Sequence, residues 1–220
     1  RYCLTKGDGY QFHETPNSLI LKNLVRQRDF LSSTKRTFNI KQQDISYKEE
    51  YIKNKITSVN QELSQFLEEK IKLLEKELKQ HNPQTQKLLQ SIPGVGPITA
   101  VSFISEVGDI NRFKHSKQLT AYIGIDPRTH ESGTSIKGKG HITKRGNKIL
   151  RTRLFNATTV AVLYPNIFQS FFQKKRSEGK PYRVALVATM HKMTHVIFAV
   201  WKRGTPYIEN RVLKKVVDEI

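Results

Sequence analysis

The chain has 220 residues, 37% of them hydrophobic and 26% charged, which is enough for one globular core and an additional extension. Lys and Arg number 38 against 19 Asp and Glu, and this net charge of +19 indicates a polyanionic partner, with nucleic acid favoured over an anionic membrane surface. A single cysteine, Cys3, excludes a disulfide framework and a paired-cysteine metal site and fits a reducing, intracellular setting. The sequence contains no uninterrupted run of 18 or more apolar residues, so no membrane span is predicted.

The first part of the chain is predicted to be a loop-like stretch followed by a basic helix. Residues 1–16 contain Gly7, Gly9 and Pro16, which are typical of turns. Asn17 or Ser18 offers an N-cap to a segment in which apolar residues from Leu19 to Phe38 alternate with Lys and Arg. Direct nucleic-acid contact and a solvated face beside a core stripe are both compatible with this pattern.

Residues 44–82 are predicted to form a long amphipathic helix of coiled-coil character. Apolar residues from Ile52 to Leu78 recur at spacings of three and four, with Glu, Lys, Gln and Asn between them. A lone helix of this length leaves its apolar stripe exposed unless a second helix covers it. Dimerisation and an intramolecular hairpin are both open, and Asn82-Pro83 ends the helix.

The remainder of the chain is predicted to be a helical domain. One helix runs up to Ile92 and a second continues to Val107, where Gly108 closes it. Ser116 is predicted to cap a short helix that Gly124 terminates. Further helical spacing appears in residues 147–163, 166–175 and 181–201. The predicted fold class is therefore mainly α: a long coiled-coil helix, then a helical domain with a helix-hairpin-helix-like element and a Gly-rich basic loop.

The first candidate functional element is the turn Ile92-Pro93-Gly94-Val95-Gly96-Pro97 between two helices. Glycines allow a tight turn and leave backbone amides uncovered, so a phosphate can approach the N-terminus of the next helix. Gly94 and Gly96 are therefore predicted to bind a nucleic-acid backbone, as in helix-hairpin-helix elements. The alternative is an ordinary turn between helices.

The second candidate element is the Gly-rich basic stretch from Asp126 to Asn147 with the helix start that follows it. Between Arg128 and Arg153 it holds eight Lys or Arg and one acidic residue. Such a loop can wrap a phosphodiester, and a hydroxyl of Ser132 or Ser135 could attack the phosphorus. By composition alone, binding without reaction is the stronger interpretation, because Ser and Gly are common turn formers. The predicted nucleic-acid-binding cations are Arg128, Lys137, Lys139, Lys144, Arg145, Lys148 and Arg151.

Two histidines, His191 and His195, lie four residues apart on one predicted helix face. The spacing is that of a zinc-protease motif, but Lys192 stands where that motif has its catalytic Glu, and a third ligand is not evident. The two histidines are interpreted as core or surface residues, and no metal site is expected in this chain. The aromatic residues of the same region are interpreted as core rather than as base-stacking platforms.

Several of these blocks, in this order and spacing, resemble the C-terminal domain of the insertion-sequence 110/116/902 transposases, over about residues 84–207. The matching blocks are Ser91-Ile92-Pro93-Gly94-Val95-Gly96, Ala121-Tyr122-Ile123-Gly124-Ile125-Asp126-Pro127, Glu131-Ser132-Gly133, Ile142-Thr143-Lys144-Arg145-Gly146-Asn147 and Leu150-Arg151. The resemblance implies a two-part, oligomeric enzyme, which in many family members is guided by a structured bridge RNA. Its N-terminal RuvC-like part binds divalent metal, and its C-terminal part supplies a serine that attacks DNA. The matching serine here is Ser132, with Ser135 as the fallback.

The resemblance gives a domain organisation. Residues 1–43 correspond to the tail end of the RuvC-like domain and the basic helix, 44–82 to the coiled coil, 83–207 to the C-terminal transposase domain and 208–220 to a charged tail. The metal-binding carboxylates of relatives precede the segment that Arg1-Tyr2-Cys3-Leu4 resembles, and Asp8 and Asp126 are not placed to replace them. Magnesium is thus implied for the full-length enzyme, with none expected in this chain, which is not expected to transpose alone.

The resemblance also implies partners and a location. DNA and a structured guide RNA are the expected partners, together with a second copy of the chain through residues 44–82, and no membrane partner is expected. The expected location is the cytoplasm of a bacterial or archaeal cell, in association with the nucleoid. A non-catalytic DNA- or RNA-binding dimerisation module is the alternative function.

Overall fold

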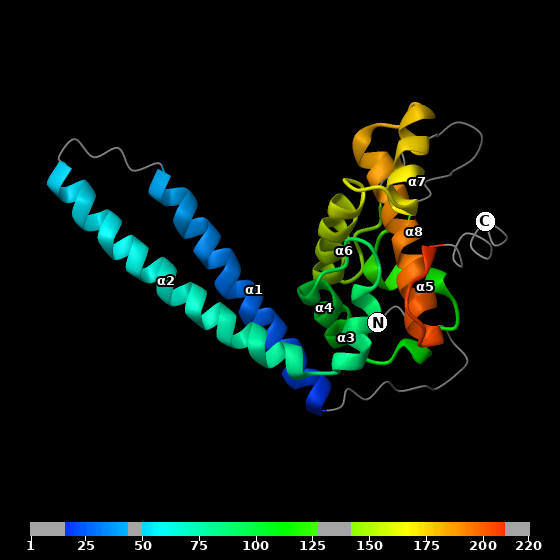
Figure 1. Cartoon of the computed structure of the whole chain (residues 1–220), viewed down its shortest axis with the longest axis horizontal. Helices are drawn as coiled ribbons and strands as arrows, with labels where there is room; N and C mark the ends of the chain where they lie inside the picture. The colour runs from blue at the N-terminus through cyan, green and yellow to red at the C-terminus, as the bar shows by residue number, and fades with distance from the viewer. Residues whose placement is uncertain (1–15, 44–49, 127–141, 210–220) are drawn as a thin grey trace. The chain divides into compact units, whose positions relative to one another are not determined.

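The computed structural model describes residues 16–43, 50–126 and 142–209. Within these ranges the chain is mainly α, which confirms the predicted fold class (Figure 1). The chain divides into two compact units, an α1–α2 unit of Glu14–Asn82 and a C-terminal unit that begins at Pro83. The described elements are α1 (Pro16–Gln43), α2 (Glu50–Gln80), α3 (Pro83–Gln90), α4 (Pro97–Val107), the 3-10 turn η1 (Ile110–Arg112), α5 (Ser116–Ile123), α6 (Lys148–Ala161), α7 (Ile167–Ser177) and α8 (Tyr182–Arg203).

Helices α1 and α2 lie side by side as an antiparallel hairpin, which both views show. Leu21 and Val25 of α1 are buried in this unit, as are Leu67 and Leu78 of α2. The apolar stripe of α2 is therefore covered over part of its length by α1, as the hairpin alternative required. Helix α2 nevertheless keeps several large apolar side chains exposed, among them Ile52, Val59, Leu63, Phe66 and Leu73.

Ion pairs cross between the two helices of the hairpin. The Arg28 guanidinium donates to Glu75 from two nitrogens, Nε at 2.9 Å and Nη2 at 2.6 Å. Lys35 Nζ lies 2.7 Å from Glu68 Oε2, and Lys35 and Lys72 hold the pKa of Glu68 below its ordinary value. Some of the cations that made α1 a candidate basic helix thus serve to join it to α2.

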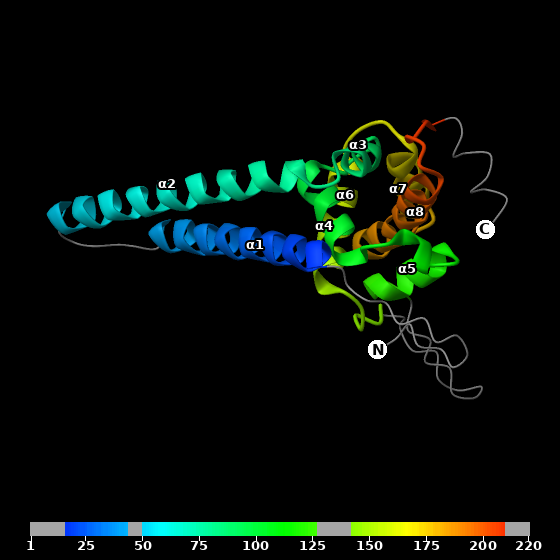
Figure 2. The same cartoon turned by 90° about the horizontal axis from the view of Figure 1, so that it is seen from below.

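The C-terminal unit is built around α4 and α8. Every residue of α4 from Thr99 to Val107 is buried, and α8 packs against α3, α5, α6 and α7 (Figures 1 and 2). Helix α8 is long and apolar enough to cross a membrane by length and composition alone. Half of that apolar window is buried within the unit, including Met193 and Val196, so α8 serves as a core helix in this fold.

The helix ends follow the sequence signals closely, with one correction. Gly108, Gly124 and Gly204 end α4, α5 and α8, each at positive φ, and the ends at Gly108 and Gly124 were predicted. The predicted N-cap of α5, Ser116, is wrong, because the helix already includes Ser116 and His115 is the capping residue. The Gln118 side chain accepts the backbone N–H groups of Lys114 and His115, which stabilises the start of the helix one residue earlier.

Candidate nucleic-acid interface

The turn between α3 and α4 is a tight one, and its two glycines have different roles. The Val95 N–H donates to the Ile92 carbonyl at 3.0 Å, and Gly94 adopts a φ of +85°. A Cβ at Gly94 would lie 2.2 Å from the Ala157 carbonyl oxygen of α6. Glycine is therefore required at position 94 by the packing of the turn on α6, whatever else it binds.

Gly96 is the N-cap of α4 and lies in open space. Its φ of −84° is accessible to any residue, and a Cβ there would meet no atom within 4 Å. Pro97 occupies the first helical position, where its missing N–H costs nothing. The start of α4 is thus open on the side of Gly96, and of the two glycines it is Gly96 that a phosphate could approach without displacing side chains.

The two ends of the Gly-rich basic loop are held together in a short paired segment, which we call the stem. It consists of residues 122–126 and 142–147. The Asn147 N–H donates to the Tyr122 carbonyl at 2.8 Å, the Lys144 N–H to the Gly124 carbonyl at 3.1 Å and the Thr143 N–H to the Asp126 carbonyl at 2.9 Å. These antiparallel contacts hold the described residues on either side of 127–141 next to each other.

A close approach of two glycines makes the stem possible. A Cβ at Gly146 would lie 2.3 Å from both the Gly124 nitrogen and the Tyr122 carbonyl oxygen. A Cβ at Gly124 would lie 2.4 Å from the Gly146 nitrogen, and Gly124 also has a φ of +80°. No other residue fits at either position unless the backbone moves, so this crossing explains the glycine in each of the two motif blocks.

A buried carboxylate anchors the returning strand of the stem, and the sequence did not predict it. Glu106 of α4 is 3% exposed, and its Oε2 accepts the Asn147 side-chain amide at 2.8 Å. The Tyr122 hydroxyl donates to the Glu106 carbonyl at 2.8 Å. Asn147 also caps α6 by accepting the Leu150 N–H. The sequence signal that could have predicted this contact is the single Glu in the apolar run from Ile98 to Val107, because a buried charge without a partner is costly.

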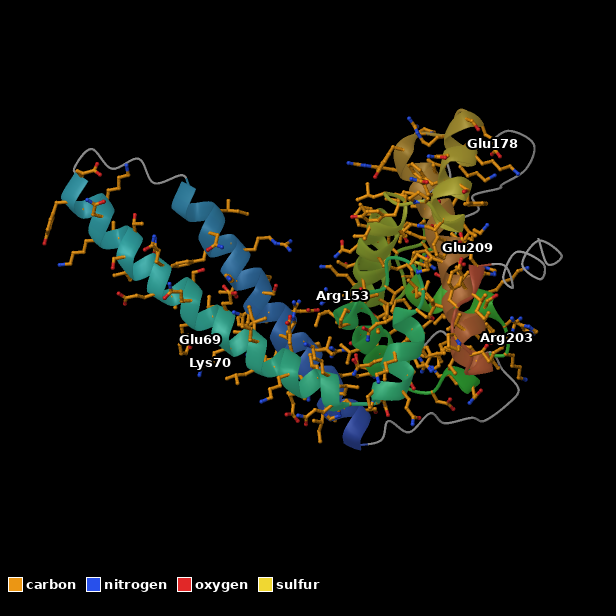
Figure 3. The ribbon with its side chains drawn as sticks, in the orientation of Figure 1. Glu69, Lys70, Arg153, Glu178, Arg203 and Glu209 are labelled. Carbon is orange, nitrogen blue, oxygen red and sulfur yellow. The ribbon has the colours of Figure 1, made fainter. Side chains whose placement is uncertain are left out.

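The predicted cations of the stem and the first turn of α6 fall into two groups. Lys144 and Arg145 of the stem and Lys148, the first residue of α6, are exposed. Arg151 is half-buried, and its Nη1 donates to the Ile123 carbonyl at 3.0 Å, so part of its guanidinium supports the C-terminus of α5. Neighbouring Arg153, which Figure 3 labels, donates from Nε to the Ser102 hydroxyl of α4. The first three cations are the ones that solvent and ligands reach freely.

Several candidate residues lie outside the part of the chain that the structure describes. They are the nucleophile candidates Ser132 and Ser135 and the predicted phosphate-binding residues Arg128, Lys137 and Lys139. Residues 1–15, for which a loop-like stretch was predicted, and residues 210–220 of the predicted charged tail also lie outside it.

The two α8 histidines support the stem and the start of α5. His191 Nε2 lies 2.7 Å from the Ile125 carbonyl oxygen, and His195 Nδ1 lies 3.1 Å from the Ser116 hydroxyl. Burial raises the pKa of Asp126, and the nearby His191 opposes that shift.

The described residues do not fit a magnesium site. Among them, no group of three or more His, Cys, Asp or Glu side chains could hold a metal ion. Glu106 is committed to Asn147, and burial disfavours the charged form of Asp126 that a metal would need.

Residues 86–173, which contain the α3–α4 turn, the stem and α6, match the model described as "Transposase IS116/IS110/IS902 family". These residues are a transposase domain of that family. The matched residues include both glycines of the crossing, the buried Glu106 and the exposed cations of the stem and the start of α6.

Named relatives agree with this assignment. A pilin gene-inverting protein of Moraxella bovis is 34% identical over 122 residues, covering 54% of this chain and 38% of that protein. The transposase for insertion sequence element IS1111A of Coxiella burnetii is 38% identical over 122 residues, covering 54% and 33%. The transposase for IS1328 of Yersinia enterocolitica is 34% identical over 163 residues, covering 71% and 48%. The chain matches less than half the length of these relatives.

Proposed function

We propose that the C-terminal unit is the DNA-handling part of an insertion-sequence transposase, and that Ser132 is its nucleophile, with Ser135 as the fallback. The observation that carries the proposal is the stem. A backbone crossing that admits only glycine holds both ends of a basic, serine-bearing loop beside three exposed cations, Lys144, Arg145 and Lys148. A phosphodiester near these cations would lie close to where the loop leaves the core.

The backbone of Lys144 supports a functional role for that residue. Lys144 has a φ of +53°, in the left-handed region that glycine adopts at far lower cost. Its side chain is exposed, so packing does not explain why lysine occupies the position. Backbone strain of this kind is concentrated at functional sites, and an exposed lysine at such a position fits phosphate binding.

The proposed chemistry needs two contributions from this chain. Lys144, Arg145 and Lys148 would hold the non-bridging oxygens as negative charge develops on them. The Ser132 hydroxyl would attack the phosphorus and form a serine–phosphate bond. The phosphorus–oxygen bond to the leaving strand breaks, and the departing oxygen takes up the proton that the serine loses.

The binding part of the proposal is tested by the salt dependence of DNA affinity. We expect Lys144→Ala/Arg145→Ala/Lys148→Ala to reduce the slope of log affinity against log salt by about 2 to 3, since each lost phosphate contact removes about 0.9. The matched control Lys53→Ala/Lys55→Ala/Lys76→Ala removes the same charge from the α2 surface and should leave the slope nearly unchanged. Equal slopes for the chain and the stem variant would contradict the proposal.

The chemical part is tested by trapping a covalent adduct on nicked or suicide DNA with a longer relative that carries the Glu-Ser-Gly block. Replacing the serine that matches Ser132 with Ala should abolish the adduct and leave affinity nearly intact, because a neutral hydroxyl contributes little to phosphate binding. An adduct lost only in the variant matching Ser135→Ala would transfer the role to Ser135. An adduct that survives both changes would rule out both serines.

Magnesium belongs to the proposal only for the longer enzyme, because the described residues of this chain do not fit it. When bound, the metal would stabilise charge at the phosphate that is cut. We expect this chain alone, with DNA, magnesium and guide RNA, to bind without exchanging strands. Measurable strand exchange by the isolated chain would contradict this expectation.

Self-association through the α1–α2 unit is a further part of the proposal. Ile52, Val59, Phe66 and Leu73 recur every seven residues along α2, and all four are exposed. A stripe with this spacing is typical of a helix that packs against another helix, here one from a second copy of the chain. Val59→Lys/Phe66→Lys should shift the chain toward monomer in sedimentation velocity, whereas Glu62→Lys on a polar position should not. A chain that is monomeric before any substitution would contradict this part.

A non-catalytic binding module is the second candidate function, and the basic charge of the stem region supports it equally. A structured guide RNA is a proposed second ligand, and the proposed location is the cytoplasm, in association with the nucleoid. Binding with the expected salt slope but without a serine-dependent adduct in the longer relative would favour the non-catalytic module. RNA that competes with DNA for the stem cations would place both ligands on the same surface.

A further inference from the structure

The turn between α7 and α8 carries an excess of positive charge that the stem does not account for. Between Asn166 and Arg203 the sequence has eight Lys or Arg residues and one carboxylate, Glu178. Figure 3 labels Glu178 at the end of α7 and Arg203 at the opposite end of α8. Four of the cations gather around the turn, and Lys192 of α8 lies close to Lys174 of α7. These five residues are called here the α7–α8 cationic surface: Lys174, Lys175, Arg176, Lys180 and Lys192.

Glu178 balances only a fraction of this charge. Its carboxylate lies 2.8 Å from Lys175 Nζ, and Lys174 and Lys180 are close enough to help Lys175 lower the pKa of Glu178. Three ammonium groups therefore share one carboxylate. The Arg176 guanidinium donates to the Lys180 carbonyl at 2.7 Å, which fixes the turn and keeps its cations near one another.

Lys192 is the member that simple helix electrostatics does not explain. Lys174, Lys175 and Arg176 stand in the last turn of α7, where the helix dipole favours cations. Lys192 lies in the middle of α8, half-buried, with Nζ 4.7 Å from the centre of the Phe171 ring. Burial and the nearby Lys174 lower the pKa of Lys192. A half-buried ammonium beside a second ammonium opposes folding, and a bound anion would relieve that cost.

Two cations of the surface lie over an aromatic ring. Lys175 Nζ lies 5.5 Å from the centre of the same Phe171 ring, so two ammonium groups are held over one aromatic side chain. The rings of Phe172 and Tyr182 meet edge to face at 5.3 Å between centroids, and Tyr182 is 49% exposed. Cations held on aromatic rings lose less side-chain freedom on binding, which favours phosphate contacts.

We propose that the α7–α8 cationic surface binds the phosphate backbone of a nucleic acid, as a contact additional to the cations of the stem. The inference rests on the proposed nucleic-acid function of the C-terminal unit. Nucleic acid is favoured over an anionic membrane because Ile167 and Phe168 at the start of α7 are buried, and the large apolar side chains that α7 and α8 expose are Tyr182 and Val184, too few for a continuous apolar face. A helix that lies on a bilayer inserts an exposed apolar face beside its cations.

The test compares two variants of the whole chain by fluorescence anisotropy with a labelled 30-base-pair duplex. Lys174→Ala/Lys180→Ala/Lys192→Ala should weaken binding at least about tenfold near physiological salt and reduce the salt slope by about 2 to 3. The control Lys53→Ala/Lys55→Ala/Lys76→Ala has the same change in charge and should behave like the unmodified chain. An equal loss in both variants would mean that total charge is responsible, and would overturn the proposal.

Two further outcomes separate this inference from the function on which it rests. If the unmodified chain binds no nucleic acid, the proposed function itself fails. If the stem variant weakens binding and the α7–α8 variant does not, only the present inference fails. Vesicles containing phosphatidylserine serve as the alternative ligand, and capture of the chain by these vesicles but not by the duplex would reassign the surface to membranes.

A separate readout guards against a folding artefact. Lys192→Met removes a half-buried charge while keeping a side chain of similar length, so it should leave the melting temperature unchanged or raise it while affinity falls. A fall in both melting temperature and affinity would indicate that Lys192 is structural, and would contradict its role in binding.

Discussion

The α1–α2 unit and the C-terminal unit show how differently two helical regions can be held together. In α1–α2, Leu21, Val25, Leu67 and Leu78 form the buried apolar contact, and ion pairs cross between the helices. In the C-terminal unit, all of α4 from Thr99 onward is buried. Apolar residues recur at helical spacing in both regions. This spacing determines which helices pack together only where the apolar side chains are almost completely buried. The hairpin therefore keeps a surface for association, and the C-terminal unit keeps a fixed geometry for its site.

The largest expected effect lies at the glycine crossing of the stem. Gly146→Val should destabilise the C-terminal unit by about 2 to 4 kcal/mol, because the new side chain would overlap the backbone of Gly124 and Tyr122. Urea unfolding followed by circular dichroism measures this change. Gly96→Ala is the control, and it should cost about 1 kcal/mol or less, since nothing lies within 4 Å of its Cβ and only the N-cap preference for glycine over alanine is lost. Similar losses in both variants would show that the crossing is not the constraint.

The next effect concerns the buried carboxylate. Glu106→Ala should cost about 1 to 3 kcal/mol, because it leaves the Asn147 amide without its acceptor at the start of α6. Exposed Glu209 provides the control, and Glu209→Ala should be nearly neutral. Unfolding midpoints that are the same for both variants would argue against Glu106 as the anchor of the stem.

Lys144 should separate stability from binding. Lys144→Gly should stabilise the C-terminal unit by about 0.5 to 1 kcal/mol, because glycine adopts the left-handed backbone more easily. The same variant should bind DNA more weakly, since one cation is lost. Thermal unfolding and anisotropy titration measure the two effects. A variant that is more stable and binds as tightly as the unmodified chain would remove the case for Lys144 as a phosphate contact.

The smallest expected effect is in the hairpin. A double-mutant cycle with Arg28→Ala and Glu75→Ala should give a coupling of about 0.5 to 1 kcal/mol, because the guanidinium makes two donations to a half-buried carboxylate. The more exposed pair Lys35–Glu68 should give a smaller coupling. A larger coupling for Lys35–Glu68 would contradict the ranking by burial and geometry.

The sequence predicted most of the helices because their end signals are local. Gly108, Gly124 and Gly204 end helices at positive φ, and Asn147 and Asn166 cap the helices that follow them. The N-cap of α5 was predicted wrongly because the Gln118 side chain accepts two backbone N–H groups from within the helix. This capping arrangement starts the helix one residue before the predicted start.

The site was only partly predictable, since its key contacts join residues far apart in the chain. The spacing of the sequence motifs identified the glycine-bearing blocks, but it could not show that the backbones of Gly124 and Gly146 lie too close together to admit a Cβ. Nor could it show that Glu106 accepts the Asn147 amide, 41 residues away. Arg151 was predicted to be a phosphate contact from its charge, yet its guanidinium also holds the end of α5, which depends on the fold.

The central claim is that the exposed cations of the stem and the start of α6 contact a nucleic-acid backbone, and site-specific photo-crosslinking tests it most directly. A photoreactive amino acid placed at position 145 should crosslink to bound duplex DNA, and the same group at the exposed position 76 of α2 should crosslink far less. Efficient crosslinking at 76 with none at 145 would contradict the claim, because the DNA would then lie on the hairpin and not at the stem.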